Sequence, residues 1–86
     1  MCLIKLYLKM SYLKLIWDFK GPNSEHIAKH HEIHLKEFFD LEKKQLIKSG
    51  IESLNLSHHI AYAFIDKSDL EYIKKSLKPH RGQLVN

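Results

Sequence analysis

Four of the seven histidines lie between residues 26 and 34, and their spacing suits either metal binding or proton transfer. His26, His30 and His34 recur at every fourth residue, which places them along one side of a helix. Imidazoles four residues apart on a helix can share one metal ion. The sequence therefore predicts His30 and His34 as ligands of a divalent transition metal, with His26, Glu37 or a histidine of a later strand as the third ligand.

His31 and His34 are the predicted catalytic residues, because a helix turns both toward its apolar stripe. Burial lowers the pKa of a histidine and keeps a neutral base available near pH 7. Such a base would serve proton transfer on a small, partly apolar molecule. The expected ligand-binding side chains are aromatic or polar residues of neighbouring strands: Trp17, Tyr62, His59 and Asp18.

Plainer interpretations of these histidines stay open. A histidine on an apolar face is commonly half-buried and bonded to a carbonyl or carboxylate, and exposed histidine ladders bind metals adventitiously. The segment His31–His34 is one residue shorter than the H-E-x-x-H of zinc proteases, and the chain has no P-loop, GxGxxG or GxSxG motif. We therefore expect no cofactor, with a divalent transition metal as the alternative.

Alternating apolar and polar residues predict the strands that would face these histidines. Residues 12–19 alternate, with Trp17 on the more apolar face. The segment from residue 58 or 59 to residue 65 is apolar on both faces, which is typical of a central strand. Its Ala61 and Ala63 leave room for a bulky neighbour. The other two predicted strands span residues 51–56 and 83–85.

Helical spacing of apolar residues predicts two helices between these strands. The first runs from residue 23 or 24 to about residue 48 and would end at Gly50 in a left-handed conformation. The second follows the segment Ser68-Asp69-Leu70-Glu71, which has the pattern of a capping box, and stops before Pro79.

The resulting order is strand, helix, strand, strand, helix, strand. This order predicts an α+β, ferredoxin-like βαββαβ sandwich, in which a four-stranded antiparallel sheet carries two helices on one face. A unit without the short last strand is the alternative. Residues 12–86 form the predicted single domain, and residues 1–11 form an N-terminal extension or an extra strand.

The face of the sheet away from the helices is expected to be largely apolar, and in so short a chain a homodimer that pairs two sheets would cover it. With this layout the chain resembles the dimeric α+β barrel superfamily. The resemblance rests on Leu15–Phe19, His30–Leu35 and Ile60–Phe64. It implies a pocket between helix and sheet or inside the barrel. Members include cofactor-independent monooxygenases, lactone isomerases, stress proteins and many uncharacterised proteins, so the resemblance implies no single reaction.

Charge and composition bear on the partners. The net charge is +4, but 13 of the 14 basic residues are lysines and no block of charge stands out. Nucleic-acid readers rely on arginine and on concentrated charge, so we expect no nucleic-acid partner. No apolar segment approaches the ~18 residues that span a bilayer, so we expect no membrane partner and a cytoplasmic protein. Besides a small-molecule enzyme, a metal-binding or regulatory module and a plain dimeric interaction domain remain open.

Overall fold

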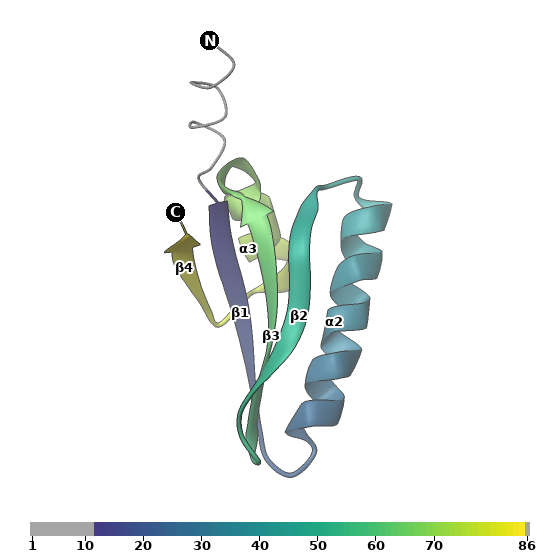
Figure 1. Ribbon diagram of the computed structural model, residues 1–86. Coiled ribbons are helices and arrows are strands. Elements are labelled where there is room, and N and C mark those ends of the chain that lie inside the picture. Colours follow the sequence, from purple (N-terminus) through teal and green to yellow (C-terminus); the bar gives the residue numbers. More distant parts are fainter. Residues whose placement is uncertain (1–11, 86) are drawn as a thin grey trace.

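The computed structural model describes residues 12–85, which form one unit made of a β-sheet and helices (Figure 1). The predicted extension, residues 1–11, lies outside the described residues. The elements, in chain order, are β1 (Tyr12–Lys20), α2 (Ser24–Leu41), β2 (Leu46–Asn55), β3 (His58–Asp66), a 3-10 turn (Lys67–Asp69), α3 (Leu70–Leu77) and β4 (Arg81–Val85). No helix within this part of the chain is long and apolar enough to cross a bilayer.

The four strands form one antiparallel sheet in the order β2-β3-β1-β4. The prediction of an α+β fold with a four-stranded antiparallel sheet and two helices is therefore confirmed. β1 and β3 occupy the centre, and their register sets Trp17 opposite Ala61 on one face and Ile16 opposite Tyr62 on the other. This alternation decides which predicted site residues can meet.

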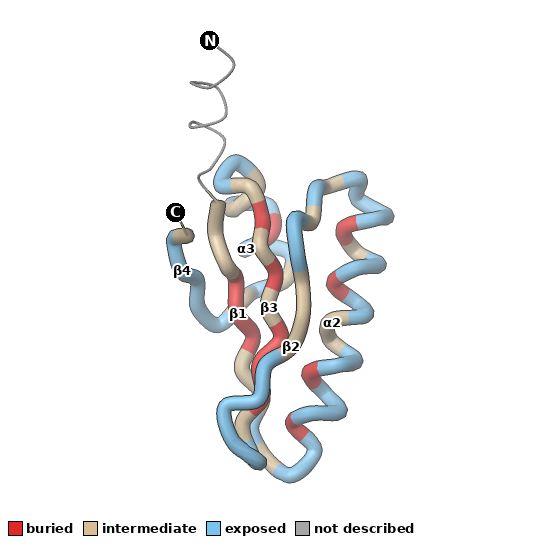
Figure 2. Tube along the Cα trace, in the orientation of Figure 1, coloured by how far each residue is buried: buried red, intermediate tan, exposed pale blue. Residues whose placement is uncertain are grey.

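The core lies between the sheet and the helices (Figure 2). Trp17 and Ala61 of the sheet belong to one buried cluster with Leu35 of α2 and Ile73 of α3. The small Ala61, which is fully buried, stands directly across from the large Trp17 indole, so the two side chains fill one layer without crowding. The alanines of β3 thus leave room for a bulky neighbour, as predicted.

The boundary between α2 and β2 differs from the prediction. α2 ends at Leu41, and β2 begins at Leu46, so residues 46–50 are extended and not helical. Lys43 takes a left-handed conformation, with φ of 55°, and reverses the chain between the two elements. Gly50 therefore does not end a helix. It lies inside β2, opposite Tyr62 of β3.

The start of the second helix also differs in detail. Ser68 lies inside the 3-10 turn, and the cap of that turn is Asp66, whose carboxylate accepts hydrogen bonds from the Ser68 backbone N–H and hydroxyl. α3 begins only at Leu70, and Asp69 at its N-cap makes no side-chain cap bond. The predicted capping box is therefore wrong in its residues, although the helix itself is present.

Aromatic and charged side chains share the sheet face away from the helices, called here the open face. It carries Tyr62 and Phe64 of β3, with ring centroids 5.6 Å apart. Lys14 of β1 lies over the Tyr62 ring, at 4.7 Å from Nζ to the centroid, and forms an ion pair of 3.3 Å with Glu52 of β2. Lys14 thus shields the Tyr62 ring while keeping its charge paired.

Candidate functional site

His31 lies on the inner side of α2 and packs against the sheet. Its ring centroid is 5.0 Å from that of Trp17 and 5.3 Å from that of Phe19, both on the helix-facing side of β1. Nε2 of His31 is buried and has no hydrogen-bond partner among the described residues. A buried polar atom without a partner costs free energy, about 1–3 kcal/mol, and a ligand that reached this nitrogen after the surrounding side chains moved would remove that cost.

The electrostatic surroundings keep His31 neutral. Its pKa is lowered below the usual 6.5, first because burial disfavours the charged ring and then because His34 and His80 add positive charge when protonated. A neutral imidazole offers one lone pair and one N–H, and it can take up a proton. The direction of this pKa shift is the one expected for a partly buried histidine, and a catalytic role for His31 stays a prediction.

Backbone contacts fix the neighbours of His31. The Trp17 indole Nε1 donates to the carbonyl oxygen of Leu77 at the end of α3, at 2.9 Å. His80 accepts a hydrogen bond at Nδ1 from the Asp18 backbone N–H, at 2.7 Å, and its ring centroid lies 6.4 Å from that of Phe19. A neutral His80 therefore carries its proton on Nε2. Phe19 and His80 are members of this group that the sequence did not indicate as site residues.

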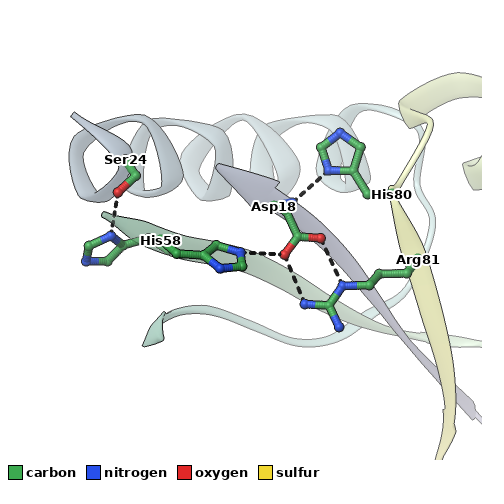
Figure 3. Close-up of polar contacts among 6 residues, drawn as sticks. Asp18, Ser24, His58, His80 and Arg81 are labelled. Atoms are coloured by element: carbon green, nitrogen blue, oxygen red, sulfur yellow. Dashed lines mark hydrogen bonds and ion pairs between the residues drawn. The ribbon is translucent and has the colours of Figure 1, made fainter. Parts of the chain in front are cut away.

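Asp18 lies on the other side of β1, at the centre of a charged cluster (Figure 3). Arg81 donates to both carboxylate oxygens, with Nε to Oδ2 and Nη2 to Oδ1 each at 2.9 Å, and His58 Nε2 lies 2.8 Å from Oδ1. Chiefly because of the Arg81 hydrogen bonds, the pKa of Asp18 is held far below its ordinary value of 3.8. The carboxylate is thus already bound by side chains of β3 and β4, which favours a structural role.

His59 is also engaged within the fold. Its Nδ1 lies 2.7 Å from Oγ of Ser24, and both residues are buried, with 6 % and 0 % of their surface exposed. Ser24 is labelled in Figure 3 and begins the first turn of α2. The contact ties the start of α2 to β3. A serine with no exposed surface cannot meet a substrate in this conformation, so the pair does not suit nucleophilic catalysis.

His34 and Tyr62 do not join His31. The His34 side chain is 63 % exposed, on the outer side of α2, so the expectation that it faces the core is wrong. Tyr62 points to the open face, because its register partner is Ile16 and not Trp17. Of the predicted site, His31 and Trp17 come together, and His59 lies on the same side of the sheet, directly opposite Phe19. Asp18, His34 and Tyr62 point elsewhere.

His30 and His34 do come together, as the metal prediction requires. Their rings are stacked, and their Nε2 atoms lie 3.1 Å apart. Within residues 12–85 no group of three or more His, Cys, Asp or Glu side chains is gathered to hold an ion. The pair can therefore supply two ligands, and a third from the same chain is not in place.

A cavity of about 260 Å³ lies near His80, between α3 and β4. Leu15 and Gly82 line it from the sheet, and Leu70 and Lys74 line it from α3. Pro79, His80 and Arg81 close the remaining side.

Comparisons with known proteins give no relative for this chain. No family model matches it, and neither the curated proteins nor the solved structures include a match. The likeness to the dimeric α+β barrel superfamily therefore stays a prediction, and function must be argued from the residues themselves.

Proposed function

We propose that this protein binds a small, partly apolar molecule at His31. The observation that carries the proposal is the buried Nε2 of His31, which lacks a hydrogen-bond partner among the described residues. Trp17 and Phe19 would contact the apolar part of the ligand, since both rings lie within 5.3 Å of the His31 ring, centroid to centroid. A polar group of the ligand would pair with Nε2 and remove the cost of burying it.

The same nitrogen would serve as a general base on a substrate with an acidic proton. Its lowered pKa keeps it unprotonated near neutral pH, which is the state a base needs. Proton abstraction of this kind needs no cofactor, in keeping with the isomerase-like or monooxygenase-like chemistry of the superfamily that the chain resembles. The catalytic proposal depends on the ligand-binding proposal, which is therefore tested first.

His31→Leu is the variant that tests ligand binding. Leucine keeps the apolar packing but removes both ring nitrogens. Small acids, amides and phenols would be screened against the wild-type chain by ligand-observed NMR, and each hit would be measured again on the variant. We expect hits to lose at least about 10-fold in affinity, which corresponds to one hydrogen bond of about 1.4 kcal/mol. His34→Leu, on the outer side of α2, is the matched control and should keep the affinity.

The binding proposal fails if the wild-type chain yields no hit, or if His31→Leu and His34→Leu bind every hit equally.

A stability measurement on the same variants gives a separate check. His31→Leu should raise the free energy of unfolding by about 1 kcal/mol at pH 7, because it removes a buried atom without a partner. The wild type loses stability as the pH falls below 6.5, since the unfolded chain then binds the proton more readily. The difference in the free energy of unfolding between His31→Leu and the wild type should therefore increase below that pH.

We also propose that the chain is a ferredoxin-like homodimer whose open faces pair. The proposal is supported by the central positions of β1, which is followed by α2, and of β3, which is followed by the 3-10 turn and α3. It is further supported by Tyr12, Tyr62 and Phe64, whose rings lie half-buried on the open face. Pairing two such faces would remove this aromatic surface from water. With one cysteine and no disulfide framework, the cytoplasm is the compartment we propose.

A further inference from the structure

His30 and His34 form a close pair on the outer side of α2. Their rings are nearly parallel, with an interplanar angle of 9° and centroids 4.7 Å apart. Their Nε2 atoms lie 3.1 Å from each other, and both residues are exposed. The pair and His31 lie on different sides of the helix, so the metal proposed here would not occupy the position of the ligand proposed at His31.

The separation of the two nitrogens fits a single metal ion. Imidazole nitrogens bind first-row metals at about 2.0–2.1 Å. Two such bonds that end on atoms 3.1 Å apart enclose an angle of roughly 95–100° at the metal, from the same bond length. This angle lies between the right angle of octahedral or square-planar geometry and the wider tetrahedral angle. Because the rings are stacked, their nitrogen lone pairs lie in nearly parallel planes, so the two rings would have to turn toward each other to bind one ion.

Glu37 provides a second, separate observation. Its Oε1 lies 3.6 Å from Nδ1 of His34, the ring nitrogen on the far side from His30. A carboxylate at this position favours the tautomer with the proton on Nδ1, which leaves the lone pair of Nε2 free for a metal. The sequence suggested Glu37 as a metal ligand. In the structure it faces the nitrogen that a metal would not occupy, where it would orient the ring.

We propose that His30 and His34 form a two-histidine chelate for a first-row divalent ion, with Glu37 as its orienting partner. The affinity order for such nitrogen ligands runs from copper, the tightest, to nickel and zinc, whereas magnesium prefers oxygen and is excluded. The remaining coordination positions are open to water, because no third protein ligand is gathered there among residues 12–85. The chelate thus suits an exchangeable ion or one shared with a second ligand.

Isothermal titration calorimetry of the untagged chain with CuCl₂, NiCl₂, ZnCl₂ and MgCl₂ measures the affinity for each ion and so tests the chelate. His30→Gln and His34→Gln each remove one ligand from an exposed position, so the fold is preserved, as circular dichroism would check. We expect each variant to weaken copper and zinc binding at least 10-fold. His26→Gln is the matched control, one turn earlier on the same helix, and it should leave the affinity within twofold of the wild type.

Two further measurements separate this chelate from diffuse binding. Glu37→Gln should weaken copper binding by about 10-fold, the low end for loss of a carboxylate behind a ligating histidine. The electron paramagnetic resonance spectrum of the copper-loaded chain should show hyperfine coupling to two nitrogens, and to fewer in His34→Gln. The chelate is wrong if His26→Gln weakens binding as much as His34→Gln, or if the double variant His30→Gln/His34→Gln binds copper as tightly as the wild type.

Discussion

Asp18 links three strands through one carboxylate. It lies on β1, receives both Arg81 hydrogen bonds from β4, and contacts His58 of β3. Its side chain is 19 % exposed, so the contacts are shielded from water more than those of ordinary surface ion pairs. Paired Arg and carboxylate groups in this two-bond geometry are among the stronger polar contacts in proteins. Asp18 therefore holds β4 to the centre of the sheet.

Asp18→Asn should lower the free energy of unfolding by about 1–3 kcal/mol at pH 7, since the charge-assisted bonds to Arg81 are lost. The lowered pKa of Asp18 means that its contribution is present above the unfolded value of 3.8 and is lost as the pH falls below it. Urea denaturation at pH 7 and at pH 3 measures this. The difference in the free energy of unfolding between the wild type and Asp18→Asn should be smaller at pH 3 than at pH 7. An equal difference at both pH values would contradict a stabilising role for the Asp18 carboxylate.

The sequence predicted correctly that His31 faces the sheet and wrongly that His34 does, and the reason is geometric. α2 buries Ser24, Ala28, Leu35 and Phe39, so the centre of its inner stripe runs through Leu35. His34 precedes Leu35 by one residue and is thus turned about 100° away from it. Ile27 lies seven residues before His34 and so on nearly the same side of the helix, which makes that side look apolar in the sequence, but Ile27 is 45 % exposed. An apolar residue on the surface is common, and a single sequence does not reveal which one it is.

At the level of the elements, strands with two-residue alternation were predictable and the α2–β2 boundary was not. β1 alternates between a more apolar and a more polar face, and β3 is apolar on both faces, which is typical of a central strand. Residues 46–51 have Leu46, Ile47 and Ile51 at spacings that suit a helix as well as a strand. The connection between α2 and β2 consists of Glu42, Lys43, Lys44 and Gln45, and it contains no glycine or proline. Pairing with β3, a tertiary contact, decides the outcome.

Tyr62 lies so close to Gly50 that position 50 has no room for a side chain, and this predicts how substitutions there change stability. A Cβ at position 50 would lie 2.8 Å from Cζ of the Tyr62 ring, too close for both to stay. Gly50→Ala should therefore destabilise the chain by about 1–2 kcal/mol, at the low end for overpacking. In a Tyr62→Ala background the same change should be neutral or stabilising, because alanine restricts the unfolded chain. Thermal unfolding of the four chains measures this double-mutant cycle. Equal effects in both backgrounds would contradict the contact.

For the whole molecule, the open face decides the oligomeric state. We expect light scattering at micromolar concentration to give twice the chain mass, because the aromatic side chains of Tyr12, Tyr62 and Phe64 would be covered by a second copy. Tyr62→Glu places a charge in the middle of this face and should give a monomer, since two like charges would then meet or be buried. Ile33→Glu adds the same charge at a 55 % exposed position of α2 and should leave the mass doubled. A wild-type monomer would reject the paired-sheet arrangement and leave the His31 site to be judged by ligand binding alone. Dissociation of both variants would move the interface to the helix layer.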